Sequence, residues 1–164
     1  MIDSSDAYRL FGNPYTVWDE GLYMTIWNVP EYITQAIPAI PRRIYCHRQM
    51  VKPLEMAFRY VIYRGLADQI KTWDGCFQVR PIRGYAKTVN HALEEGRLKD
   101  AMRYMSIHSW GLAIDINAAW NGLGREPEMS EELVKCFEDA GFDWGGRWAR
   151  KDGMHFQLSE IKPM

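Results

Sequence analysis

Residues 112–117 read Leu112-Ala113-Ile114-Asp115-Ile116-Asn117, with a bulky apolar side chain at every second position. Successive side chains of a β-strand point to opposite faces, so this alternation predicts a half-buried strand with Asp115 on its open face. A second stretch, Met154-His155-Phe156-Gln157-Leu158, alternates in the same way and places His155 on the open face. If the two strands are neighbours, Asp115 and His155 point into one cleft, and together they form half of a metal site.

The flanking sequence predicts helices around this sheet. One helix is expected over residues 52–68, and residues 88–105 have helical character that is interrupted at Gly96. Ser130 is a favourable N-cap for a further helix, which is expected to end at Gly141. These helices would supply the apolar faces that cover the sheet.

The remaining segments complete the predicted architecture. A strand is expected around residues 77–80, and residues 1–50, rich in aromatics and prolines, predict short strands and loops wrapped on the core. The fold class is therefore α+β, with a small antiparallel sheet flanked by helices. A length of 164 residues favours a single domain spanning residues 1–164.

Composition excludes several function classes. The formal net charge is -1, so the chain lacks the basic excess that phosphate backbones demand, and no nucleic-acid partner is expected. No run of about 18 apolar residues occurs, so no membrane span is expected. The three cysteines form no CxxC pair, which indicates neither a disulfide framework nor a cysteine-built zinc site. We expect a monomer.

The first residues, Met1-Ile2-Asp3-Ser4-Ser5-Asp6, are acidic and lack the positive start and apolar middle of a secretory signal. The expectation is a protein that is made in the cytoplasm. A substrate outside the membrane would then require separate export or cell lysis.

The third metal ligand is expected at His108. On one helix, His108 and Asp115 would lie about 10.5 Å apart, and on one strand their odd separation would send them to opposite faces. The chain must bend between them, and Gly111 is placed to permit the bend. Two histidines and one carboxylate, with an open fourth position, are the ligands of a catalytic zinc site. We therefore expect one zinc ion per chain, held by His108, Asp115 and His155.

A hydrolytic site also needs a base and a cation for the developing oxyanion. Asp152 lies three residues before His155 and is the candidate general base. Arg80 and Arg83 lie at the expected end of a strand and are candidates for oxyanion stabilisation. His47 and His91 are not assigned a role.

The stretch Ser106-Ile107-His108-Ser109-Trp110-Gly111-Leu112-Ala113-Ile114-Asp115 resembles the S-x-H-x-x-G-x-A-x-D signature of the zinc D-alanyl-D-alanine carboxypeptidase family. That family includes phage L-alanyl-D-glutamate endolysins and the vancomycin-resistance D-alanyl-D-alanine dipeptidases. Asp152-Gly153-Met154-His155-Phe156 resembles its second block, and the segment from Trp73 to Pro81 is similar to its arginine-bearing strand. The resemblance covers about residues 70–160, the expected catalytic core, with residues 1–50 as an extension packed on it.

The resemblance implies a fold shared with lysostaphin-type peptidases and the hedgehog amino-terminal domain. It implies a peptidase of the peptidoglycan stem peptide, with Asp152 as the base and zinc on His108, Asp115 and His155. Arg80 matches the arginine that binds substrate and transition state, although Arg83 is close enough to leave that choice open.

Substrate contacts are expected from Arg83, Ser106, Trp144 and Gln157. Many relatives carry glutamate where this chain has Gln157, and Trp144, in a Trp-Gly-Gly stretch, is either a core residue or part of the binding surface. The Trp-Gly-Gly stretch resembles phage-type members and favours a phage lysis enzyme.

Three functions remain open at this stage. The first is an endopeptidase that cuts the L-alanyl-D-glutamate bond or a nearby bond, released onto the wall during lysis. The second is a D,D-carboxypeptidase or dipeptidase, which needs a cation beyond Arg80 for the free carboxylate, and Arg83, Arg147 and Arg150 are candidates. The third is a non-catalytic zinc module, against which Asp152 argues because a structural site has no use for a base.

Overall fold

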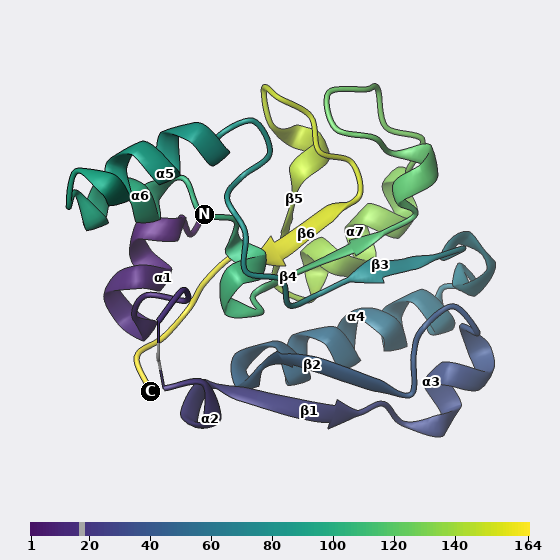
Figure 1. Cartoon of the computed structure of the whole chain (residues 1–164). Coiled ribbons are helices and arrows are strands. Elements are labelled where there is room, and N and C mark those ends of the chain that lie inside the picture. Colours follow the sequence, from purple (N-terminus) through teal and green to yellow (C-terminus); the bar gives the residue numbers. More distant parts are fainter. Residues whose placement is uncertain (17–18) are drawn as a thin grey trace.

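The fold is built on two antiparallel sheets, seen in a computed structural model that describes residues 1–16 and 19–164 (Figure 1). The larger sheet has four strands in the order β3 (Trp73–Gly75), β4 (Ala113–Ile116), β6 (His155–Leu158) and β5 (Phe142–Trp144). The smaller sheet pairs β1 (Met24–Asn28) with β2 (Arg43–His47). The predicted α+β class with a small antiparallel sheet is confirmed.

Helices surround both sheets. They are α1 (Ser4–Phe11), α2 (Glu20–Tyr23), α3 (Glu31–Ala36), α4 (Val51–Tyr63), α5 (Ala86–Glu94), α6 (Leu98–Arg103) and α7 (Glu131–Asp139). Short 3-10 helices lie at Arg48–Met50, Ala67–Gln69, Ile107–Trp110, Ala118–Trp120 and Gly145–Arg147. No helix among the described residues has both the length and the apolar character needed to cross a membrane.

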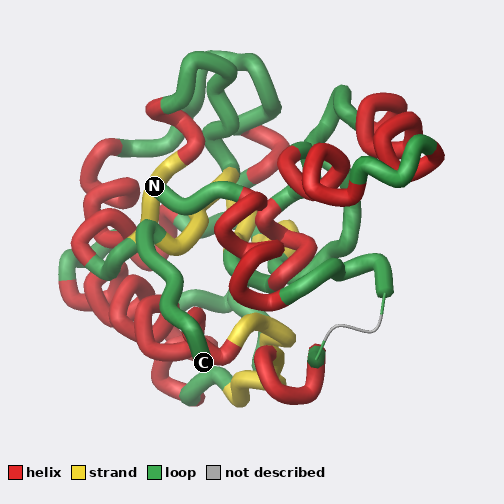
Figure 2. The backbone as a smooth tube through the Cα atoms, turned by 90° about the vertical axis from the view of Figure 1, so that its left-hand side faces the viewer, coloured by secondary structure: helices red, strands yellow, loops and turns green. Residues whose placement is uncertain are grey.

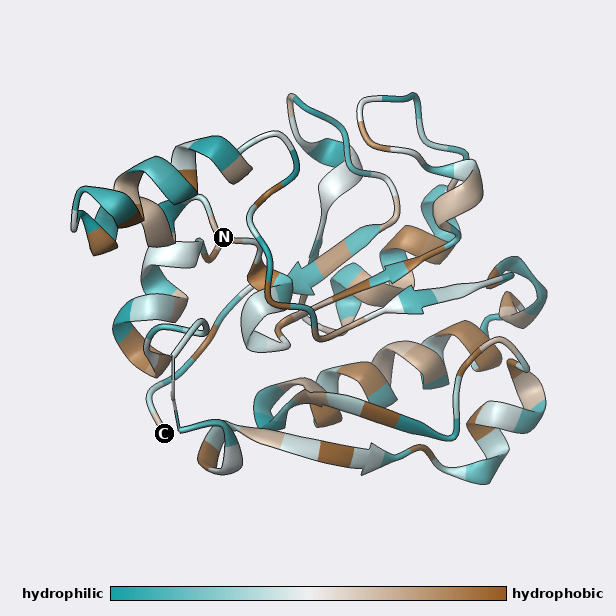
Figure 3. Cartoon of the chain, in the orientation of Figure 1, coloured by the Kyte–Doolittle hydropathy of each residue, from teal (hydrophilic) through white to brown (hydrophobic). Residues whose placement is uncertain are grey.

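The long helix α4 joins the two sheets into one core. Figure 1 shows α4 running between the β1–β2 pair and the four-stranded sheet, and Figure 3 shows apolar residues along it. The ring of Phe58 contacts Trp27 of β1, Trp73 of β3 and Phe137 of α7, with ring centroids 6.2–6.5 Å apart. Such aromatic contacts bury large apolar areas, so α4 fixes the smaller sheet against the half of the molecule that carries β4 and β6.

Several predicted helices are confirmed. Ser130 accepts a hydrogen bond from the amide of Leu133 and caps α7, as predicted. The helical segment 88–105 is divided into α5 and α6, with Gly96 in a left-handed conformation between them. The helix expected over residues 52–68 is α4, and it ends earlier, at Tyr63.

The prediction of a strand around residues 77–80 is wrong. The strand lies at Trp73–Gly75, and residues 77–80 form a loop whose backbone bonds to the 3-10 helix Ile107–Trp110. The amide of Gln78 donates to the carbonyl of His108, and the amide of Arg80 donates to Ser109 Oγ. These groups are therefore not available for a strand ladder.

Residues 1–50 also differ from the expectation of strands and loops. Their described part contains β1 and β2 but also three α-helices and the 3-10 helix Arg48–Met50, and Val17 and Trp18 lie outside the described residues. Helix α1 begins with a capping box in which Asp3 and Asp6 each accept a backbone N–H, a signal that is present in the sequence. Figure 2 shows the N-terminus beside a strand, and the Ile2 carbonyl accepts a hydrogen bond from Gln157 of β6. Buried apolar residues from Ile2 to Leu158 form one cluster.

Candidate active site

Strands β4 and β6 bring the predicted metal ligands together. Asp115 and His155 are directly opposed across the two strands, as predicted. Asp115 Oδ1 lies 3.2 Å from His108 Nε2 and 3.4 Å from His155 Nδ1, and the two nitrogens lie 3.2 Å apart. All three side chains are buried. Among the described residues they form a group able to hold a metal ion.

His108 reaches this group because the chain turns sharply on both sides of it. Ser106 Oγ accepts a hydrogen bond of 3.3 Å from the amide of His108 and caps the 3-10 helix. Gly111 ends that helix in the left-handed region, with φ of 67°. A Cβ atom at Gly111 would lie 2.8 Å from the backbone nitrogen of His47, so close packing also requires glycine there. The predicted bend at Gly111 is confirmed.

The outer nitrogen of each histidine faces an acceptor. His108 Nδ1 lies 2.6 Å from the carbonyl oxygen of Cys76, and His155 Nε2 lies 2.9 Å from Gln157 Oε1. The amide nitrogen of Gln157 donates to the carbonyl of Ile2 at 3.0 Å, which fixes its oxygen toward His155. A carbonyl only accepts, so the outer nitrogen of each ring carries the proton.

The inner nitrogens therefore present lone pairs to each other and to a carboxylate. Asp115 Oδ1 has no well-aligned hydrogen-bond donor among the described residues. Three such atoms in contact are stabilised by a cation between them, which can be a metal ion or a proton. Burial lowers the pKa of His155, but the negative charge of Asp115 has the larger, opposite effect, and the pKa lies above its ordinary value. Burial raises the pKa of Asp115, but His108 and His155 outweigh it, and the pKa lies below its usual range. The donor set, with outer partners that orient each ring, fits zinc.

Asp152 lies beside these ligands in a cavity of about 280 Å³. Its backbone amide donates to the carbonyl of Gly145 at 3.0 Å, and its carbonyl accepts from the amide of His155 at 3.1 Å. A Cβ atom at Gly145 would lie 2.4 Å from the Asp152 carbonyl oxygen, so glycine is required for this approach. Burial raises the pKa of the Asp152 carboxyl above its usual value.

Arg80 lines the same cavity and its backbone is held on both sides. The Arg80 amide donates to Ser109 Oγ at 3.2 Å, and the amide of Ser106 donates to the Arg80 carbonyl at 2.9 Å. Its Nη1 donates to the carbonyl of Pro81, whereas its buried Nε has no hydrogen-bond partner among the described residues. Arg80 thus lines the cavity as a cation whose backbone is fixed beside the metal-ligating residues.

The residues expected to bind substrate have different positions. Arg83 and Ser106 line the cavity. Gln157 also lines it, but the protein uses both ends of its side chain, so the structure gives it the role of orienting His155.

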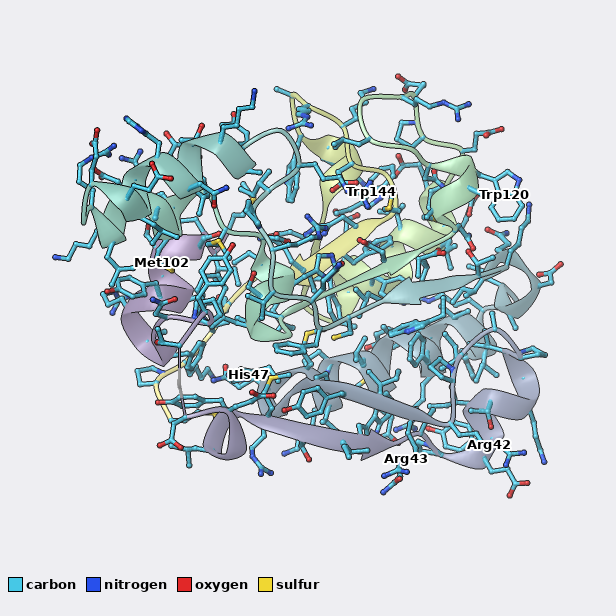
Figure 4. All side chains as sticks on the ribbon, in the orientation of Figure 1. Arg42, Arg43, His47, Met102, Trp120 and Trp144 are labelled. Atoms are coloured by element: carbon cyan, nitrogen blue, oxygen red, sulfur yellow. The ribbon has the colours of Figure 1, made fainter. Side chains whose placement is uncertain are left out.

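Trp144 lies in the core, which is one of the two positions that the sequence left open. It is buried opposite Phe156 in the β5–β6 register, their rings are stacked 6.4 Å apart, and its Nε1 donates to the carbonyl of Gly153 (labelled in Figure 4). The residue that lines the cavity is Trp148, with its ring 5.2 Å from that of His155. Trp144 follows the inward alternation of β5, and the 3-10 helix after it turns Trp148 to the other side.

Several contributors to the site carried no usable signal in the sequence. The carbonyls of Cys76 and Ile2 are backbone groups, and every residue has one. Ser109 bonds to Arg80 across a separation that only the folded chain closes. The sequence shows that residue 148 is an aromatic, Trp148. Whether its ring faces the cavity depends on the preceding 3-10 helix, which was not predicted.

Comparison with known proteins bears on this same segment. Residues 99–158 match the family model described as D-alanyl-D-alanine carboxypeptidase. The family resemblance is confirmed. The matched segment contains His108, Asp115, His155 and Asp152, so the similarity to this peptidase family falls on the residues of the site.

A solved structure and the curated protein sequences provide two further comparisons. The L-Ala D-Glu endopeptidase ChiX of Serratia marcescens is 18% identical to this chain, with a TM-score of 0.38. The similarity covers 79% of this chain and 88% of that one. No curated protein sequence matches this chain.

Proposed function

We propose that this protein is a zinc-dependent peptidase that hydrolyses a bond of the peptidoglycan stem peptide, between L-alanine and D-glutamate or nearby. The observation that carries the proposal is the convergence of His108 Nε2, Asp115 Oδ1 and His155 Nδ1 beside a cavity that Asp115 and His155 line together with Asp152 and Arg80. Two imidazoles and one carboxylate leave zinc an open position for a substrate.

Each residue has a defined task in this hydrolysis. Zinc bound by the three side chains would act as a Lewis acid toward the carbonyl of the scissile bond. Asp152 accepts a proton from the attacking water and then delivers it to the leaving amine. Arg80 donates to the carbonyl oxygen as negative charge develops there, and its fixed backbone means that little reorganisation is needed.

The competing functions share this chemistry in part. A D,D-carboxypeptidase would use the same residues on a terminal D-alanine, and the matched family carries that description. A non-catalytic zinc module would have no use for Asp152, whose side chain borders the cavity. The Trp144-Gly145-Gly146 stretch, which resembles phage-type members, supports release onto the wall during phage lysis as the biological setting.

Digestion of purified peptidoglycan tests the proposal. The zinc-loaded protein should release fragments with a new amino-terminal D-glutamate, identified by mass spectrometry. Chelation should abolish their release and added zinc should restore it. Release of D-alanine alone would favour the carboxypeptidase, and wall left intact by the zinc-loaded protein would contradict both.

A further inference from the structure

The cavity beside the metal-ligating residues is lined by three arginines, Arg80, Arg83 and Arg150. Their guanidinium groups form no ion pair with a carboxylate within the described part of the chain, where Arg80 and Arg150 donate to backbone carbonyls. Arg147 differs, because it binds Glu131 and Glu138 at 2.8–2.9 Å. Of the cations that sequence left as candidates for a free carboxylate, only Arg83 and Arg150 therefore remain beside Arg80.

Arg150 joins the two loops that border the cavity. Its Nη1 donates to the carbonyl of Arg83 at 2.8 Å, which holds the loop after Arg80 against the loop before Asp152. Gly84 has φ of 94°, and a Cβ atom there would lie 3.8 Å from both Nη atoms of Arg150. The Arg150 guanidinium thus packs over this turn, while its Nε and Nη2 have no partner within the described chain. The Arg150 guanidinium is held on one wall of the cavity, and Arg83 lines the same cavity from the loop that Arg150 holds.

The chemistry of the substrate explains why cations are needed there. D-glutamate continues the stem peptide through its γ-carboxyl group, so its α-carboxyl group stays free on the carbon that carries the leaving nitrogen. A terminal D-alanine also bears a free carboxylate on that carbon. Either candidate bond therefore brings a carboxylate within one residue of the carbonyl that Arg80 contacts. Guanidinium groups bind carboxylates by charge-assisted and often bidentate hydrogen bonds.

We propose that Arg83 and Arg150 form a subsite for the free α-carboxylate of the leaving residue, next to the carbonyl held by Arg80. The subsite rests on the proposed peptidase function and specifies its substrate: a stem peptide in which this carboxyl group is ionised. A peptide in which it is amidated presents a neutral group to two cations and loses the charge-assisted bonds.

Binding to a variant without turnover tests this subsite. The probes are L-Ala-γ-D-Glu-L-Lys and L-Ala-D-isoGln-L-Lys, which differ only in the free or amidated α-carboxyl group. Calorimetric titration of zinc-loaded Asp152→Asn should give a Kd on the order of 10–100-fold lower for the acid. Adding Arg83→Gln or Arg150→Gln should weaken binding of the acid and leave the amide nearly unchanged. Glutamine at position 150 retains a donor for the Arg83 carbonyl, which protects the loop.

Controls separate the subsite from general damage and from the proposed function. Arg147→Ala removes a nearby cation that is already ion-paired and should leave the preference intact. N-acetyl-L-Lys-D-Ala-D-Ala and its carboxyl-terminal amide are the matched pair for the other candidate bond. Equal affinity for acid and amide in both pairs, or a preference that survives both arginine variants, overturns the subsite. A preference lost in these variants, with neither pair hydrolysed by the wild type, retains the subsite and refutes the peptidase.

Discussion

Buried histidines lie in both sheet-containing halves of this protein, but the hydrogen-bond partners of their ring nitrogens differ. His47, at the end of β2, packs against Phe11 and Tyr23, and its Nε2 has no hydrogen-bond partner in the described parts of the chain. Burial lowers its pKa to about 4, so the ring is neutral. His108 and His155, in the four-stranded half, have acceptors on their outer nitrogens and turn their inner nitrogens toward Asp115. Burial is common to both sites, and the placement of hydrogen-bond partners makes only the second of these two sites suited to hold a metal ion.

The largest expected effect concerns Asp152, the proposed general base, which lines the cavity beside Asp115 and His155. Asp152→Asn keeps the shape of the side chain but removes the base. Turnover should fall by on the order of 10²–10⁴-fold, while zinc content is unchanged because Asp152 is not a ligand. Steady-state kinetics with metal analysis of the same preparation checks this. Near wild-type turnover in Asp152→Asn would mean that another residue acts as the general base.

Arg80 is expected to come next. It is held by Ser106 and Ser109 beside the ligands, so Arg80→Ala removes a fixed donor to the developing oxyanion. We expect kcat to fall about 10²–10³-fold at both low and high salt. Arg83→Ala, at the rim, should instead raise KM and do so mainly at low salt, where screening is weak. The opposite pattern in the two variants would exchange their roles.

Much of this site could be predicted because its information is local. Alternation in residues 112–117 and 154–158 set the faces of β4 and β6, and Gly111 marked the bend that brings His108 back. The loop at residues 77–80 could not be predicted, since its backbone is bonded to a 3-10 helix about 30 residues later. The same holds for the Ile2 carbonyl, which reaches Gln157 across 155 residues. The position of Trp144 was left open because strand β5 and its pairing with β6 were not predicted.

Gln157 tests how much the outer hydrogen-bond partner of His155 contributes to metal affinity. Gln157→Leu fills the same space but removes the acceptor that orients His155, and such outer partners typically contribute about 10–100-fold to metal affinity. Competition with a chromogenic chelator should show zinc affinity reduced by that order. Gln49→Leu is the matched control near His47, since its side chain bonds to Lys162 at the other end of the chain. Equal zinc affinity in the two variants would mean that Gln157 does not support zinc binding by orienting His155.

The smallest effect is expected at His47 and concerns stability rather than activity. Its pKa is about 4 in the folded protein and 6.5 as a reference for the unfolded chain. The unfolded state therefore binds the proton first, and His47 makes the folded protein less stable as pH falls from 6.5 toward 4. His47→Leu should show a shallower loss of unfolding free energy over this range than the wild type, measured by urea denaturation. Identical slopes would mean that His47 titrates normally.

Zinc content tests the central claim most directly, because it requires that His108, Asp115 and His155 share one metal. We predict one zinc ion per wild-type chain, one in His47→Leu and in the exposed-site variant His91→Ala, and none in His108→Ala, each folded by circular dichroism. Atomic emission analysis after dialysis against zinc-free buffer gives the answer. Full zinc occupancy in folded His108→Ala would contradict the account.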